Sequence, residues 1–163
     1  MAGTDTAEED TVFNTQDRKK AKGELTAWLV DRASLKVIEK RVCNNLITTL
    51  GDTWLAGKCS DAAGLAALSD IGVGTGTTAP AVSDTGLETQ LDKNALYLTP
   101  WQGVGSASNE FYVRTIFTET EAVGTLSEAG LFYSTSLFSR VLISPTVNKT
   151  SDKVLVLQWK ISF

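Results

Sequence analysis

The sequence contains no histidine, and this absence excludes a large part of enzyme chemistry. Without an imidazole there is no Ser-His-Asp or Cys-His nucleophile, no histidine general base and no histidine zinc ligand. The two cysteines are too few to supply the four thiolates of a structural zinc site. The sequence therefore predicts a non-enzymatic protein that has no metal site and no cofactor.

Long apolar runs, proline and excess positive charge are also scarce. No segment has the length and hydropathy of a membrane-spanning helix, and residues 1–10 are acidic where a signal peptide would be basic and then apolar. The net charge of -4 argues against a nucleic-acid partner, which usually requires a basic face. We expect a protein folded in a cytoplasm, with no membrane, nucleic-acid or small-molecule ligand.

Residues 1–22 are predicted to form an extended arm that precedes the folded domain. Large apolar side chains are rare here, so the segment cannot bury enough surface to fold alone. We expect Val12 and Phe13 to anchor the arm on a partner, and the alternative is an unattached tail. A basic group follows the anchors and is included in the predicted partner-binding set: Arg18, Lys19, Lys20 and Lys22.

Residues 23–163 alternate apolar and polar side chains over most of their length, which predicts β-strands. The segments 24–30 and 35–42 predict a hairpin, and the many charges of its second strand suggest an edge strand. The other expected strands are 68–73, 95–101, 110–119, 124–133, 137–147 and 155–163. Strands at this spacing are typical of an antiparallel β-sandwich or jelly-roll-like domain. We expect no shaft or second domain after residue 163.

One α-helix is predicted over residues 45–57, packed on the sheet. Its apolar stripe is formed by Leu46, Leu50 and Trp54, which recur every four residues. Asn44 or Asn45 is expected to cap its N-terminus.

Cys43 and Cys59 flank this helix. A straight helix of that length separates its ends by about 18 Å, whereas a disulfide requires Cα atoms within about 7 Å. We therefore expect two buried free thiols, and a bridge to a neighbouring chain remains the alternative.

A glycine-rich segment contains Gly72, Gly74, Gly76 and Pro80. It does not match a phosphate-binding loop, because Thr77 stands where the lysine belongs, and it lacks the last glycine of a dinucleotide fingerprint. We interpret it as a strand end and turn where the backbone closely approaches another element. Asp84 is expected to cap a short helical turn over residues 86–91.

Three carboxylates, Glu119, Glu121 and Glu128, lie close together in the sequence. Their spacing matches neither a calcium-binding loop nor a fixed glycosidase pair. Glu128 stands in an apolar strand, where a carboxylate needs a hydrogen-bond donor. We therefore predict a structural ion pair between Glu128 and either Arg114 or Arg140.

Three stretches of the chain resemble a family of small structural proteins of tailed bacteriophages. They are residues 44–51, residues 71–80 followed by 84–89, and residues 124–132 together with 148–155. The glycine-rich stretch and the Ser-Glu-Ala-Gly-Leu-Phe stretch also resemble the attachment domain of phage tail-collar fibres. The resemblance implies a non-enzymatic virion component, assembled in the host cytoplasm.

The resemblance leaves the position on the virion open. We expect a capsid decoration or cement protein, a homo-oligomer that binds the major capsid protein through its β-domain and its arm, because we expect no fibre shaft after the last strand. A tail, collar or baseplate component, bound to other tail proteins, is the alternative. A carbohydrate-binding module that stacks sugars on Trp28, Trp101 and Trp159 is a third possibility.

Overall fold

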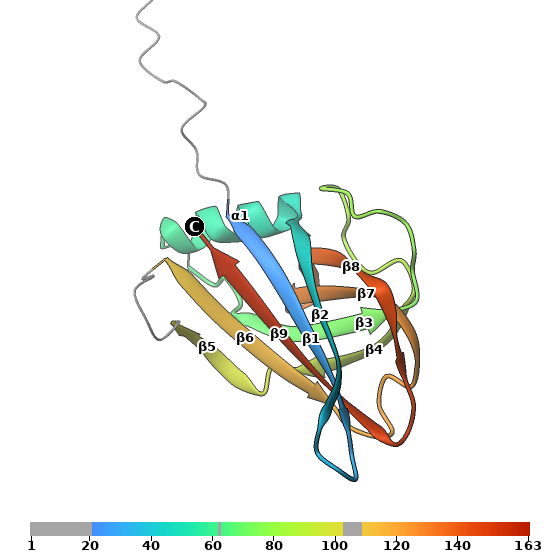
Figure 1. Ribbon diagram of the computed structural model, residues 1–163. Helices are drawn as coiled ribbons and strands as arrows, with labels where there is room; N and C mark the ends of the chain where they lie inside the picture. The colour runs from blue at the N-terminus through green and yellow to red at the C-terminus, as the bar shows by residue number, and fades with distance from the viewer. Residues whose placement is uncertain (1–20, 62, 103–108) are drawn as a thin grey trace, which may run out of the picture.

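The computed structural model describes residues 21–61, 63–102 and 109–163, which form nine β-strands and one α-helix (Figure 1). The helix, α1 (Thr49–Cys59), follows the second strand. The strands are β1 (Lys22–Asp31), β2 (Val37–Ile47), β3 (Leu68–Gly74), β4 (Gln90–Ala95), β5 (Leu98–Gln102), β6 (Glu110–Phe117), β7 (Gly124–Tyr133), β8 (Ser136–Lys149) and β9 (Lys153–Ser162). The predicted mainly β fold with one helix is confirmed.

All nine strands belong to one sheet, and its pairings are antiparallel, in the order β4-β3-β7-β8-β2-β1-β9-β6-β5. The strand predicted over residues 95–101 is found only from Leu98 onward, as part of β5. Ala95 is instead the last residue of β4, and Leu96 and Tyr97 join the two strands. The N–H of Leu96 donates to the carbonyl of Ser69 in β3 (2.9 Å), and that of Tyr97 donates to the carbonyl of Arg114 in β6 (2.7 Å).

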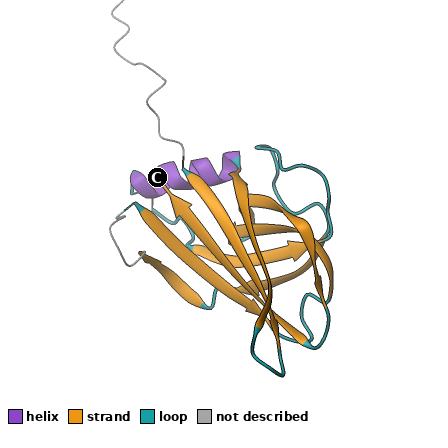
Figure 2. Cartoon of the chain, viewed as in Figure 1, coloured by secondary structure: helices purple, strands orange, loops and turns teal. Residues whose placement is uncertain are grey.

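The β4–β5 segment therefore acts as one bent strand that starts at one edge of the sheet and reaches the other. Counted in this way, eight strands curl into a nearly closed barrel (Figure 2). The predicted sandwich or jelly roll is not confirmed, because the strands share one continuous sheet instead of two packed layers.

The interior of the barrel is filled by the inward half of each alternating strand. The clearest case is β9, in which every second residue is fully buried: Leu155, Leu157, Trp159 and Ile161. Neighbouring β1 contributes Leu25, Ala27 and Leu29 to the same core. Burial of each large apolar side chain contributes about 1.5–3 kcal/mol. This packing provides the rigid frame on which the loops are held.

The helix begins four residues later than predicted, because Thr48 caps it. The Thr48 hydroxyl accepts a hydrogen bond from the N–H of Gly51 (3.1 Å) and donates to the carbonyl of Leu137 in β8 (2.7 Å). Asn44 and Asn45, the predicted caps, are instead the last polar residues of β2.

The helix lies across one end of the barrel (Figure 1). Its buried contact is Trp54, whose ring packs edge-on against Phe138 at a centroid distance of 5.5 Å.

Cys43 and Cys59 are both free, as predicted, but only Cys43 is partly buried. Cys59 is exposed, because it is the last residue of the helix rather than part of the apolar stripe.

The β2 strand is an edge strand over most of its length. It pairs with β1 from Val37 to Asn45 and with β8 only at Leu46 and Ile47. The edge predicted for residues 35–42 is therefore correct from residue 37, where β2 begins. Its last two residues join the two halves of the barrel.

Candidate functional site

The main polar feature of the described barrel is an ion pair between Glu128 of β7 and Arg140 of β8. Glu128 is fully buried, and Arg140 is 3% exposed. The Arg140 Nε donates to Glu128 Oε2 at 2.9 Å, and Nη2 lies 2.9 Å from the same oxygen. Of the two predicted partners, Arg140 is correct. Arg114 is wrong, because it lies on β6 and donates to Gln158 instead (2.5 Å).

The Glu128 carboxylate also holds the loop between β3 and β4, residues 75–89. Its Oε1 accepts hydrogen bonds from the N–H groups of Gly76 (3.0 Å) and Thr89 (2.8 Å), and its Oε2 accepts one from Glu88 (3.1 Å). A buried carboxylate is stable only with such partners. The loop is therefore fixed to the barrel at both of its ends by one side chain.

Arg140 connects the same loop to the barrel through two further carboxylates. Its Nη1 donates to Asp84 Oδ2 at 2.9 Å, and its Nη2 lies 3.5 Å from Glu88 Oε2. Asp84 also accepts from the N–H of Ala81 (2.9 Å). The predicted helical turn over residues 86–91 is wrong, because Asp84 is used in this network and β4 begins at Gln90.

The charges of this network are stabilised by their neighbours. Burial raises the pKa of Asp84, but the N–H of Ala81 and the Arg140 guanidinium lower it more, so it lies below its usual value. The N–H and hydroxyl of Thr78 lower the pKa of Glu88. Burial disfavours the charge of Arg140, but its hydrogen bonds to Asp84 and Glu128 raise its pKa overall. These three groups are charged at neutral pH, whereas a general acid or base needs a pKa near the operating pH.

The glycines of the predicted turn are needed because the loop approaches the ion pair closely. A Cβ atom on Gly76 would lie 2.5 Å from Glu128 Oε1, and one on Gly74 would lie 2.6 Å from it. A Cβ atom on Gly72 would lie 3.1 Å from the Phe132 ring. Gly72 and Gly74 are strand residues of β3, and Gly76 and Pro80 belong to the loop. The interpretation as a close backbone approach is confirmed at Gly74 and Gly76.

The other two predicted carboxylates do not join this site. Glu119 forms an exposed ion pair with Arg32, and Glu121 accepts from the N–H of Thr118 (2.7 Å).

Beside them lies Lys149, a fully buried lysine that the sequence did not reveal. Its Nζ donates to the carbonyl of Thr118 (2.6 Å), and burial lowers its pKa. Across residues 21–61, 63–102 and 109–163, no three acidic or thiol side chains gather as a metal-ligand set.

The tryptophans do not form a common platform in the described part of the barrel. Trp159 is fully buried in the core, whereas Trp28 lies on the outward face of β1. The side chain of Trp101 lies outside the described residues. A sugar-binding surface that combines Trp28 with Trp159 is therefore excluded by their opposite directions.

Most of the predicted arm, including Val12, Phe13, Arg18, Lys19 and Lys20, also lies outside the described residues. Lys22, which was predicted to belong to the arm, is instead the first residue of β1 and pairs with Ser162 of β9.

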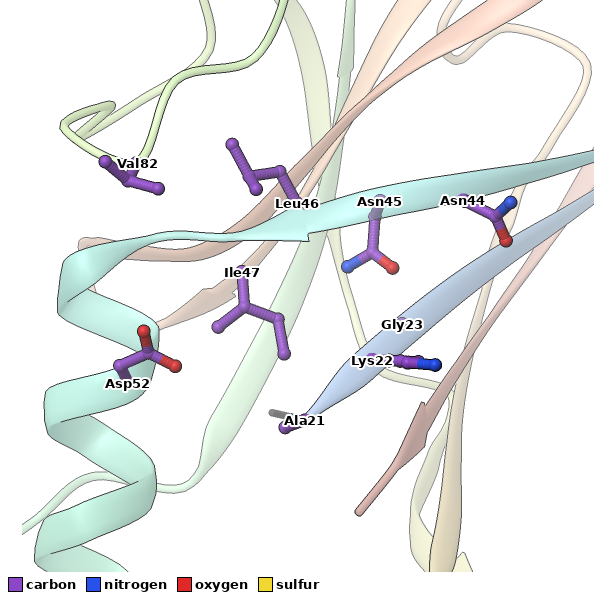
Figure 3. A pocket seen from close by; sticks show the side chains of 9 residues that line it. All are labelled: Ala21, Lys22, Gly23, Asn44, Asn45, Leu46, Ile47, Asp52 and Val82. Atoms are coloured by element: carbon purple, nitrogen blue, oxygen red, sulfur yellow. The ribbon is translucent and has the colours of Figure 1, made fainter. Parts of the chain in front are cut away.

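A cavity of about 420 Å³ opens where the chain enters β1. It is lined by residues of β1, β2, α1 and the β3–β4 loop. Figure 3 shows Asn45 and Ile47 pointing from β2 toward the start of β1, with Asp52 on the helix beside them. Val82 brings the β3–β4 loop to the same cavity, and the carbonyl of Val82 accepts from the N–H of Thr49 at the start of α1 (2.8 Å). The loop, the start of α1 and the start of β1 therefore meet at one end of the barrel.

Comparison of the chain with protein-family models, curated proteins and solved structures found no match. Within the described part of the chain, no helix has both the length and the apolar character required to cross a membrane.

Proposed function

We propose that this chain is a non-enzymatic structural protein of a tailed-phage virion, most specifically a capsid decoration or cement protein. The observation that supports it best is the β3–β4 loop, which is exposed along much of its length yet fixed by the buried Glu128–Arg140 pair. Long loops without secondary structure are usually functional. A loop that is already fixed loses little conformational freedom when it binds a partner.

The chemistry of the site favours binding over catalysis. Glu128 has hydrogen-bond donors on both oxygens, and the charges of Asp84 and Glu88 are likewise committed to Arg140 and to loop N–H groups. Carboxylates engaged in this way fix the conformation of the loop and are not free to accept or donate a substrate proton. We assign the network the role of presenting the loop.

The loop also lies in the right place to act together with the arm. Val82 is 55% exposed and lines the same cavity as Ala21, the residue that precedes β1. A partner such as the major capsid protein can then contact the loop and the arm at one end of the barrel. Many copies on a symmetric shell gain avidity from modest individual contacts.

The experiment is a binding assay of the full chain on expanded, tailless capsids of the phage that encodes it. Val82→Asp should weaken binding about tenfold or more, because it places a charge at the proposed contact. Val123→Asp is the matched control, since Val123 is 46% exposed in the turn before β7. Binding by both variants as tight as that of the unchanged chain would contradict the proposal.

The copy number per virion distinguishes the two positions on the particle. Many copies per particle, in proportion to the capsid subunits, support decoration. A few copies that purify with capsid-free tails support the alternative, a tail, collar or baseplate component. That alternative is favoured by the likeness of the glycine-rich loop to tail-collar attachment domains.

A further inference from the structure

An apolar hollow lies on the outward face of the sheet, and none of its lining residues belongs to the β3–β4 loop. It has a volume of about 250 Å³ and is lined by Trp28, Val30, Val37, Arg114 and Val156. These residues come from β1, the start of β2, β6 and β9. Because side chains alternate along a strand, the inward packing of the β1 core residues directs Trp28 and Val30 outward. The hollow can accept one large apolar side chain.

Two cations flank the tryptophan of this hollow. The Nζ of Lys40 lies 5.9 Å from the Trp28 ring centroid, and the guanidinium carbon of Arg114 lies 6.0 Å from it. Lys40 is the direct cross-strand neighbour of Trp28. Both charges on the ring are positive although the whole chain has a net charge of -4. An apolar hollow with a positive rim is complementary to an aromatic anchor accompanied by carboxylates.

The N-terminal segment of this chain has that chemistry. Four acidic residues precede Val12 and Phe13, and the first basic residue after them is Arg18. The acidic residues are Asp5, Glu8, Glu9 and Asp10. Val12 and Phe13 are the large apolar side chains between Met1 and the start of β1. The segment thus matches the hollow in both of its properties.

The length of the chain argues that the segment binds a different copy. Trp28 is seven residues along β1 from Ala21, or about 24 Å. From Ala21 back to Phe13 the chain spans at most about 26–29 Å. Folding back onto the same sheet requires a reversal of about four residues, which leaves about 14 Å, so Phe13 does not reach Trp28 of its own chain.

We infer that residues 5–13 of one copy bind the outward sheet face of a second copy. Phe13 occupies the hollow beside Trp28, and the carboxylates of residues 8–10 lie beside Lys40 and Arg114. Each copy offers one arm and one hollow, so the exchange closes into a symmetric dimer or a ring. This self-association is separate from the proposed virion role and does not depend on it.

The experiment reverses the charges on each side of the proposed contact in the full chain. The arm variant carries Glu8→Lys, Glu9→Lys and Asp10→Lys, and the face variant carries Lys40→Glu with Arg114→Glu. Sedimentation velocity measures the association state of each. Each variant alone should associate roughly tenfold more weakly than the unchanged chain, because like charges then face each other. An equimolar mixture of the two should associate again, because each reversed arm meets a face of opposite charge.

Mixing is also the step that identifies the source of the arm. If an arm bound its own chain, the two variants would stay unassociated in the mixture, and that result would overturn the inference. A chain that carries all five substitutions should associate as the unchanged chain does. The control is Lys93→Glu, since Lys93 also lies over an aromatic ring, 5.0 Å from the Phe132 centroid, but on β4. It should leave association unchanged.

Three further measurements keep the inference testable if Arg114→Glu unfolds the chain. Lys40→Glu alone should weaken association in the same direction, and Phe13→Ala should do so without changing any charge. Raising the salt from about 0.1 M to 1 M should weaken association, because the screening length falls from about 10 Å to 3 Å. An unchanged chain that is monomeric at every concentration, or association indifferent to Phe13→Ala, refutes the arm exchange.

Discussion

Glu128 is a carboxylate without exposed surface, and its charge is balanced within the barrel by Arg140 and three backbone N–H groups. Glu128→Gln keeps the shape but replaces one acceptor oxygen with an NH₂ group that faces donors. We expect a loss of about 3–5 kcal/mol in the free energy of unfolding, the usual effect of removing one partner of a buried ion pair. Urea unfolding followed by circular dichroism measures it.

Glu119→Gln is the matched control for this prediction. Glu119 pairs with Arg32 at the surface, where an ion pair contributes about 0–1 kcal/mol. Equal losses for the two variants would show that Glu128 is no more important than a surface carboxylate.

At the scale of residues, the buried ion pair was predictable because a charged side chain stands in an otherwise apolar strand. Glu128 stands between Leu126 and Leu131, so a partner had to exist, and Arg140 was one of the two candidates in nearby strands. The sequence around Lys149 gave no indication that this lysine is buried. It follows Val147 and Asn148 near a polar turn, where a lysine is normally solvated, and only the fold shows that its Nζ is enclosed by the carbonyls of the Thr118 turn.

At the scale of elements, the β3–β4 loop depends on a glycine at the position closest to the ion pair. A Cβ on Gly76 would lie 2.5 Å from Glu128 Oε1 and 2.6 Å from the Glu88 Cβ. Gly76→Ala should therefore push the carboxylate from its donors and cost about 1–3 kcal/mol, as overpacking does. Thermal unfolding gives the stability, and proteolysis of the native protein reports release of the loop.

Gly86→Ala is the control in the same loop, because a Cβ there has no neighbour within 4 Å. It should be neutral or slightly stabilising, since alanine restricts the unfolded chain. If Gly76→Ala is equally harmless, the loop is not held by the close approach that the structure shows.

The elements themselves were largely predictable, and their ends were not. Period-two alternation located β1, β6, β7, β8 and β9, but the helix was predicted too early. Leu46 and Leu50 share a helical spacing with Trp54, yet Leu46 belongs to β2. The hydroxyl of Thr48, bonded both to Gly51 and to the β8 backbone, determines where the strand ends and the helix begins. That second bond is made to a residue about ninety positions away, which no local pattern contains.

At the scale of the whole molecule, a sandwich and a barrel have the same alternation along each strand, so the sequence could not distinguish them. The difference arises at Leu96 and Tyr97, where the pairing partner of the β4–β5 segment changes from β3 to β6. This change nearly closes the sheet. Two side-chain hydrogen bonds stabilise this junction. Asn94 Nδ2 donates to the carbonyl of Ile116 (3.0 Å), and Thr115 Oγ1 donates to the carbonyl of Ala95 (2.7 Å).

The junction should therefore be the place where the barrel opens when one of these bonds is removed. Thr115 is 1% exposed, so Thr115→Val keeps its volume but leaves the Ala95 carbonyl without this donor. We expect a loss of about 1–3 kcal/mol and faster hydrogen exchange at the N–H groups of Leu96 and Tyr97. Thr53→Val on the exposed face of α1 removes a hydroxyl that bonds only within its own helix and should change neither. If exchange in Thr115→Val rises equally at β1 and β9, the barrel unfolds as one unit and the junction is not its weakest point.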